Sequence, residues 1–142
     1  MKKIYLIILI LFIFNSCAFG FFWDKKPKPI LILSPNDPRK ETQVDKLLEY
    51  HSVFKKGDRI YFLVHTQKGF KSNYIKYQIV KQDDKAHVGG YTRIKNQTVR
   101  IKNKNNYVDY FVLTEAGKYI IQIFDIENLH QWITYGEFRV VD

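Results

Sequence analysis

The chain has 142 residues, of which 46% are hydrophobic and 16% aromatic; this suffices for one packed domain plus an extension and excludes wholesale disorder. A formal net charge of +9 indicates either a solvated basic surface or a preference for anionic partners, such as lipid headgroups or polyanionic polymers. Cys17 is the only cysteine, which excludes an internal disulfide, so the fold depends on its core.

The first residues have the order of an export signal. Lys2 and Lys3 precede eleven residues without charge or proline, 4–14, and the small residue Ser16 stands directly before Cys17. A positive segment, a short apolar run and small residues predict a secretory signal. The apolar run is shorter than the roughly 20 residues that a membrane-spanning helix needs.

The segment that ends at Cys17, Phe-Asn-Ser-Cys, resembles the lipobox of bacterial lipoproteins, in the relaxed form found in spirochaetes. Ser16 matches the small residue of that motif, and Phe14 stands where Leu is usual. The resemblance implies that residues 1–16 are removed as a signal peptide and that Cys17 is lipidated through its sulfur. Residues 17–29 would then form the lipidated N-terminus and a spacer.

An uncleaved membrane anchor is the alternative. Residues 4–23 contain only two polar interruptions, and residues 21–23, Phe-Phe-Trp, have the character of an aromatic interface belt. Either form tethers the domain to a membrane. A lipoprotein would lie in the bacterial cell envelope, at the outer rather than the inner membrane, because Ala18 is not the Asp that retains many enteric lipoproteins at the inner membrane.

Residues 30–142 are expected to form one domain. Residues 30–33 predict a first strand, and residues 39–54 are the one segment with helical spacing of apolar residues. From residue 56 onward apolar residues alternate with polar ones, which predicts strands. The strands expected from this alternation are 59–67, 73–82, 91–94 with a continuation at 98–101, 107–113, 118–125, 132–135 and 137–141. Seven or eight strands separated by turns are typical of an all-β antiparallel sandwich or barrel.

Two stretches resemble immunoglobulin-like domains. Residues 56–62, Lys-Gly-Asp-Arg-Ile-Tyr-Phe, resemble the turn into the second strand, and residues 114–121, Thr-Glu-Ala-Gly-Lys-Tyr-Ile-Ile, resemble the corner before the penultimate strand. The resemblance implies an immunoglobulin-like β-sandwich in which Tyr119 forms a tyrosine corner. It also implies apolar packing by Ile121 in place of a disulfide, with Tyr77 in the space of the usual buried Trp. An ordinary core aromatic is the alternative for Tyr119.

A basic stretch near residues 93–104 is the clearest candidate binding feature. The candidate binding residues are Arg93, Lys95, Arg100 and Lys102, together with the aromatic Trp132. Such a stretch can bind an anionic surface, or it can be a charged edge strand that prevents aggregation. Tyr74, Tyr110 and Trp132 are expected to be exposed aromatics that mark a contact face.

No motif for catalysis or metal binding is found in the sequence. The four histidines have no ligand spacing, no nucleophile elbow occurs, and the two aspartates at 83–84 fit a polar turn. We therefore expect no enzyme activity, no metal and no cofactor. The expected function is a non-catalytic protein-interaction or assembly module on the envelope, which uses a sheet edge or the loops 67–73, 83–90 and 126–131. The alternative is a binder of an anionic polymer or small ligand through the basic strand; a nucleic-acid partner is not expected.

Overall fold

The computed structural model describes residues 28–40, 51–83 and 89–142. Within these ranges the protein contains strands and turns and no helix. The predicted signal, Cys17 and most of the spacer lie outside the described residues. The strands are β1 (Ile30–Ser34), β2 (Val53–Lys55), β3 (Arg59–His65), β4 (Tyr74–Gln82), β5 (Tyr91–Arg100), β6 (Asn106–Val112), β7 (Gly117–Asp125) and β8 (Asn128–Val141).

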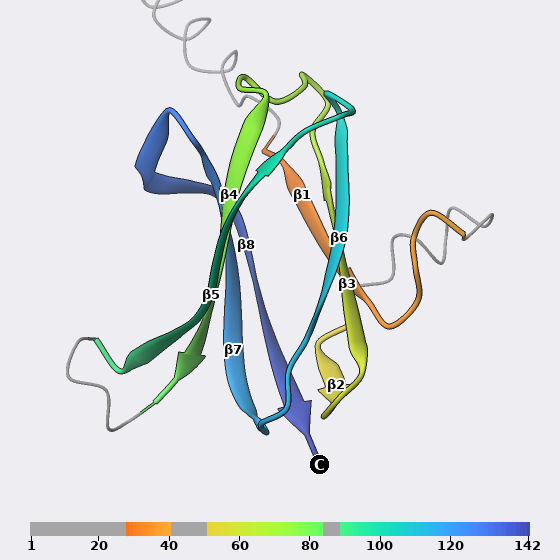
Figure 1. The fold of residues 1–142 in the computed structure, drawn as a ribbon, viewed down its shortest axis with the longest axis vertical. Helices are drawn as coiled ribbons and strands as arrows, with labels where there is room; N and C mark the ends of the chain where they lie inside the picture. The colour runs from red at the N-terminus through yellow and green to blue at the C-terminus, as the bar shows by residue number, and fades with distance from the viewer. Residues whose placement is uncertain (1–27, 41–50, 84–88) are drawn as a thin grey trace, which may run out of the picture.

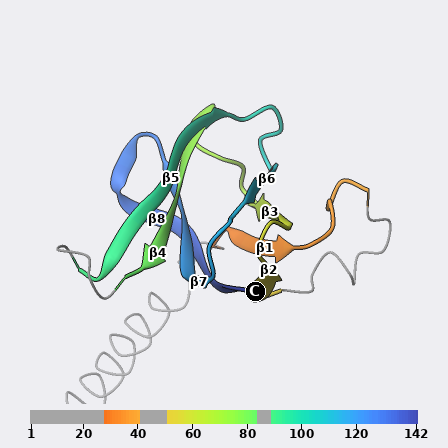
Figure 2. The ribbon, with the colours of Figure 1, turned by 60° about the horizontal axis from the view of Figure 1, so that its bottom comes forward.

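The strands form two sheets that pack face to face (Figures 1 and 2). The smaller sheet has the order β1-β3-β6, and the larger has the order β2-β8-β7-β4-β5. Paired strands are antiparallel except β2 and β8, which run parallel. Among the described strands, the chain crosses from one sheet to the other at five connections, β1–β2, β2–β3, β3–β4, β5–β6 and β6–β7, and β5 lies at the edge of the larger sheet. The predicted antiparallel sandwich is confirmed.

The alternation of side chains explains why these segments form strands. In β3 the side chains of Ile60, Phe62 and Val64 are fully buried, whereas the residues between them are partly exposed. The same alternation occurs in β4 around Tyr77 and in β7 around Ile121. A period of two sends every second residue to the same face, so each strand contributes one apolar row to the space between the sheets.

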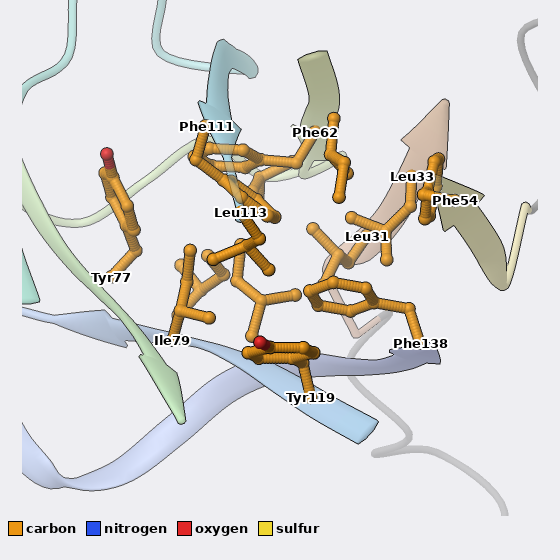
Figure 3. Packing of buried hydrophobic residues seen from close by; sticks show 14 of the residues in the cluster. Leu31, Leu33, Phe54, Phe62, Tyr77, Ile79, Phe111, Leu113, Tyr119 and Phe138 are labelled. Atoms are coloured by element: carbon orange, nitrogen blue, oxygen red, sulfur yellow. The ribbon is translucent and has the colours of Figure 1, made fainter. Parts of the chain in front are cut away.

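Aromatic rings dominate the packing between the sheets (Figure 3). The Phe62 ring from the smaller sheet contacts the Tyr77 ring from the larger one, with centroids 5.0 Å apart. Phe111 and Phe138 meet across the sheets at 5.7 Å. Burial of rings of this size is the largest single contribution to such a core, and these cross-sheet pairs hold the two layers together.

The turn before β7 positions Tyr119. Its ring is 2% exposed and stacks on Phe138 at 5.6 Å, and its hydroxyl donates a 2.7 Å hydrogen bond to the backbone carbonyl of Glu115. This bond back to the preceding turn is the geometry that defines a tyrosine corner. Two residues later Ile121 is fully buried, so apolar packing occupies this position in the core.

Three details differ from the pattern expected along the chain. Residues 91–100 form one continuous strand rather than two, because β4 pairs along the whole length of β5. Gly136 does not interrupt the last strand; it pairs with Ile121 inside β8. The predicted helix falls mostly on residues 41–50, outside the described residues. Its last two residues, Val53 and Phe54, are wrong as helical residues, because they lie in β2 and Phe54 pairs with Val140 of β8.

Candidate functional site

The basic residues of β5 divide between the two faces of the larger sheet. Lys95 pairs with the buried Ile79 and therefore faces the smaller sheet, whereas Arg100 pairs with the exposed Tyr74 on the outer face. The register shifts between Lys95 and Arg93, which leaves Ile94 without a partner, as in a β-bulge. This extra residue turns Arg93 to the outer face. The basic residues of the predicted binding stretch therefore do not form one row on this strand, because Lys95 faces inward whereas Arg93 and Arg100 face outward.

Lys95 lies over the core rather than in solvent. Its ammonium group stands 5.5 Å from the centre of the Tyr77 ring, a cation–π distance. The Tyr77 hydroxyl in turn donates a 2.8 Å hydrogen bond to Oε1 of Gln97 on the same strand. The Lys95 ammonium group thus interacts with a core aromatic ring rather than with the outer face of the sheet.

Lys102 belongs to a different group of side chains, at one end of the sandwich. The loop after β5 is fastened to the loop after β3, because the Phe70 N–H donates to the Lys104 carbonyl at 2.7 Å and the Thr66 N–H to the Asn105 carbonyl at 2.9 Å. The Asn105 side chain adds a 2.8 Å bond to the Thr66 carbonyl. These bonds hold the two loops together at one end of the sandwich. The loops carry four exposed lysines, which we name the end lysines: Lys68, Lys71, Lys102 and Lys104.

Trp132 lies on the outer face near the start of β8 and is 47% exposed. It pairs with Phe124 of β7, and its ring meets the ring of Tyr135 at 5.7 Å in an edge-on contact. Tyr135 is 52% exposed. Two large aromatic side chains thus stand together in solvent, an arrangement typical of contact surfaces rather than of a closed core.

A groove of about 840 Å³ separates the loop after β3 from the β7–β8 hairpin. Two of the three segments predicted as interaction loops, 67–73 and 126–131, meet at this groove. The prediction of a loop over 126–131 is wrong for most of that segment, because β8 begins at Asn128 and only two residues form the turn after β7. The third, 83–90, follows β4 at the opposite end of the larger sheet (Figure 1), and its residues 84–88 lie outside the described ones. The side chains that give the groove its apolar character are Phe70, Trp132, Ile133 and Tyr135.

The charges around this groove have opposite signs on its two sides. Lys68 and Lys71 come from the loop after β3, and Asp125 and Glu127 come from the hairpin. Asp125 is engaged by the backbone, since its Oδ1 accepts the Glu127 N–H at 3.0 Å. An apolar floor between a basic and an acidic rim can hold an extended peptide whose own charges alternate.

The exposed aromatics predicted from the sequence do not share one face. Tyr74, beside Arg100, and Trp132 both lie on the outer face of the larger sheet. Tyr110 lies on the outer face of the smaller sheet, where its ring contacts Tyr61 at 5.5 Å and carries the Arg59 guanidinium at 5.1 Å. All three side chains are exposed, as predicted, but they lie on two different sheets, so the prediction that they mark one contact face is wrong.

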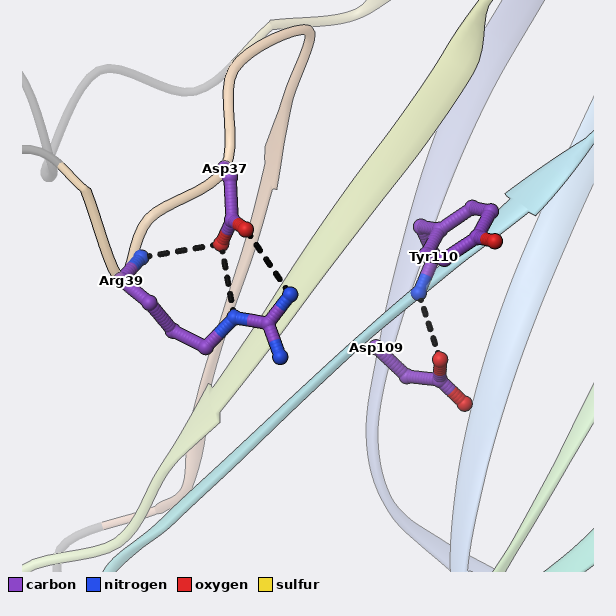
Figure 4. Close-up of polar contacts among 4 residues, drawn as sticks. All are labelled: Asp37, Arg39, Asp109 and Tyr110. Atoms are coloured by element: carbon purple, nitrogen blue, oxygen red, sulfur yellow. Dashed lines mark hydrogen bonds and ion pairs between the residues drawn. The ribbon is translucent and has the colours of Figure 1, made fainter.

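The carboxylates of two aspartates near the smaller sheet accept several hydrogen bonds from neighbouring residues (Figure 4). Asp37 accepts the Arg39 N–H at 3.1 Å and two guanidinium hydrogen bonds at 2.8 Å, which hold the pKa of its carboxyl below the ordinary value. Asp109 accepts the Tyr110 N–H at 2.8 Å and the Tyr107 hydroxyl at 3.0 Å. Burial, reinforced by the Asp109 charge, raises the pKa of Tyr107. Neither carboxylate is arranged for acid–base catalysis.

The described ranges show no group of three His, Cys, Asp or Glu side chains that could hold a metal ion. His65 instead shares a 2.7 Å hydrogen bond with the side chain of Asn106 on the neighbouring strand, and His87 lies in the segment 84–88, outside the described part. Buried side-chain polar atoms without a partner are also absent from the part of the chain that is described. In that part, no helix has the length and apolarity to cross a membrane.

No protein-family model matches this sequence, and a comparison with curated protein sequences found no match. Solved structures do match the fold. The soluble domain of PmoD from Methylocystis is similar over 80% of this chain and 90% of its own, with a TM-score of 0.51 and 14% identity. An immunoglobulin-like protein from Pseudomonas aeruginosa is similar over 83% of this chain and 100% of its own, with a TM-score of 0.50 and 8% identity. At such low identity these likenesses concern the fold alone. Together with the topology, they show that this chain has an immunoglobulin-like β-sandwich fold.

Proposed function

We propose that this protein is a lipid-anchored lipoprotein of the bacterial cell envelope whose β-sandwich is a non-catalytic module that binds a segment of another protein. The supporting observation is the groove between the loop after β3 and the β7–β8 hairpin, where Trp132 and Tyr135 are about half exposed. Exposed Trp and Tyr side chains in a concave site are the residues that most often dominate protein–protein binding.

The groove also suits a peptide better than a small polar ligand. It is open to solvent along the molecule's end, has an aromatic floor, and carries lysines on one side and carboxylates on the other. Rim charges of both signs select the direction of a bound segment more than they add affinity. Nothing in this arrangement resembles a nucleophile or a general base beside a reacting position, which supports a binding role.

The anchor part of the proposal rests on the lipobox-like segment that ends at Cys17. Lys28 and Pro29, the first described residues, line the groove, so the chain enters the domain at the groove's end. An anchored Cys17 would therefore hold the groove close to the membrane surface. The measurement is mass spectrometry of the protein extracted from membranes. A diacylated or triacylated Cys17 at the N-terminus is expected, whereas an intact Met1 with an unmodified Cys17 would refute the lipoprotein proposal.

Site-specific photo-crosslinking in intact envelopes tests the groove. A photoreactive residue in place of Tyr135 should form a discrete crosslinked product, and the same residue in place of Tyr91, at the other end of the larger sheet, should not. Adding Trp132→Ala should reduce the Tyr135 product at least tenfold, because loss of a central aromatic typically costs about 2 kcal/mol of binding. Equal products from both positions, or a product insensitive to Trp132→Ala, would contradict the proposed binding site.

Binding of an anionic polymer by the β5 strand has less support. Arg93 and Arg100 share the outer face but lie seven residues apart, which is about 20 Å along a strand, and Lys95 faces the other way. Simultaneous substitution of all three should therefore leave polymer binding by the domain unchanged, whereas a collapse of binding would restore this alternative.

A further inference from the structure

The end of the sandwich at which the chain enters is also its most basic end. The start of β1, the loop after β3 and the loop after β5 lie together there (Figure 1). Lys28 and the loop lysines Lys68 and Lys71 line one groove, and the backbone hydrogen bonds between Thr66, Phe70 and the loop after β5 bring the remaining end lysines beside them. Tertiary structure thus gathers charges that are more than 30 residues apart in the chain.

The two loops that carry these lysines contain no acidic residue of their own. Residues 66–73 read Thr-Gln-Lys-Gly-Phe-Lys-Ser-Asn and residues 101–106 read Ile-Lys-Asn-Lys-Asn-Asn, so neither loop contains a carboxylate. All four end lysines are exposed, and none forms a salt bridge with any residue that the structure describes. The nearest acidic side chains around the groove, Asp125 and Glu127, stand on its hairpin side. Lysines that merely keep a surface soluble are more often interspersed with acids.

The two loops are held in a fixed shape rather than left to move independently. Four hydrogen bonds join them: Phe70 N–H to the Lys104 carbonyl, Thr66 N–H to the Asn105 carbonyl, and the Asn105 side-chain amide to the carbonyls of Thr66 and Gln67. The Ile101 N–H adds a bond to the carbonyl of Asn73. Such a platform presents its ammonium groups together, so a broad anionic surface can meet all of them without ordering a flexible loop.

We propose that the end lysines dock this end of the domain on the anionic lipid headgroups of the membrane that carries the anchor. The proposal rests on the proposed lipid anchor at Cys17. Only twelve residues separate Cys17 from Ile30, a reach of at most about 45 Å when fully extended, so the tether keeps the domain near the bilayer. Trp132 and Tyr135 beside the groove belong to the residue types that favour the membrane–water interface.

Docking of this kind selects one orientation among many for a tethered domain. A lysine near an anionic bilayer surface favours association by about fivefold, and the effect falls off within a screening length of about 8 Å at physiological salt. Four lysines at one end therefore favour the orientation that brings them to the surface by at most several hundredfold, and repulsion of Asp125 and Glu127, on the hairpin side of the groove, lowers this figure. In this orientation the groove opens along the membrane surface, where it can meet a membrane-associated partner.

Lysine footprinting on the full-length processed protein tests the proposal. The protein, extracted from membranes with its own N-terminus, is reconstituted into vesicles of phosphatidylcholine alone or with phosphatidylglycerol, and its lysines are acetylated and quantified by mass spectrometry. We expect the end lysines to react at least fivefold more slowly in the anionic vesicles, and the protection to disappear at about 1 M salt. Lys55 and Lys118, exposed at the opposite end, should react equally in both. Equal reactivity of the end lysines in the two vesicles, or protection of Lys55 and Lys118, would overturn the proposal.

A charge-matched pair of variants completes the test. Lys102→Glu with Lys104→Glu should abolish the protection of Lys68 and Lys71, whereas Lys55→Glu with Lys118→Glu, which changes the net charge equally, should preserve it. Protection by soluble polyphosphate in neutral vesicles as strong as that by anionic vesicles would overturn membrane docking in favour of polymer binding. The N-terminal peptide in the same digest reports the acylation of Cys17 independently, so failure of the anchor and failure of docking are distinguishable.

Discussion

Replacement of Tyr119 by Phe removes one oxygen atom and one hydrogen bond from the corner before β7. The lost bond is the 2.7 Å contact from the Tyr119 hydroxyl to the Glu115 carbonyl. The ring remains, with its nearly parallel stack on Phe138 at an interplanar angle of 16°. The substitution therefore isolates the polar part of the corner from its apolar part.

The expected loss of stability follows from this geometry. A neutral hydrogen bond contributes about 1 kcal/mol net, and the full desolvation penalty applies only if its partner is left without water. Glu115 is exposed, so water can reach the freed carbonyl, and the cost should stay near 1 kcal/mol. For a domain of this size such a loss lowers the Tm by about 4 °C. Tyr119→Ala, which also removes the fully packed ring, should cost about 3–5 kcal/mol.

Equilibrium urea unfolding of the detergent-solubilised chain measures these differences, provided that the denaturant slope is unchanged. The matched control is Tyr91→Phe, because Tyr91 is 45% exposed and its hydroxyl makes no hydrogen bond to the described residues. That change should stay within about 0.5 kcal/mol. If Tyr119→Phe costs no more than Tyr91→Phe, Tyr119 acts as an ordinary core aromatic and the corner hydrogen bond does not stabilise the fold.

Two further predictions concern the core. Phe62→Ala should destabilise the fold by about 3–5 kcal/mol, because the Phe62 ring is fully buried against Tyr77, Tyr107 and Phe111. Urea unfolding measures this loss of stability, and a loss below about 1 kcal/mol would contradict the packing. Stability should also fall as the pH rises above about 10, because burial and Asp109 raise the pKa of Tyr77 and Tyr107 above the ordinary 10.0, so that the unfolded chain loses these protons first. Urea midpoints measured on either side of pH 10 give this loss of stability, and Tyr107→Phe should reduce the dependence of the midpoint on pH. A midpoint that does not fall above pH 10 would show that the fold does not protect the two hydroxyls.

Much of the fold could be predicted because burial between two sheets imposes a period of two on each strand. The strands that contain Phe62, Tyr77 and Ile121 have apolar residues at alternate positions, and these three side chains are buried, as the alternation predicts. The corner at Tyr119 was predictable for a similar reason, since its turn and its spacing are local. Pairing was less predictable: Gly136 sits within a strand because β7 supplies its hydrogen-bond partners, which no local signal indicates.

The candidate site was predictable only in part. Two of the three segments predicted as loops line the groove, but their meeting depends on the packing of the two sheets, which places the loop after β3 beside the β7–β8 hairpin. Phe70 and Tyr135 were missed as contact residues, although an aromatic residue inside a polar loop is a usable signal for Phe70. Asp109 was also missed as a structural residue; its place in the inward row of β6, between the rings of Tyr107 and Phe111, was the available signal.

Most of the strands, the apolar rows of the core and the corner could be predicted from the amino-acid sequence, because these depend on local alternation and on turn residues. The lipobox-like segment on which the proposed anchor rests is also local. The grouping of the charges, in contrast, depends on how the chain folds. A single extra residue at Ile94 sends Arg93 and Lys95 to opposite faces, and hydrogen bonds between two distant loops place Lys102 and Lys68 at the same end of the sandwich. Register and loop contacts depend on the neighbouring strand, so they can be read only after the chain has folded.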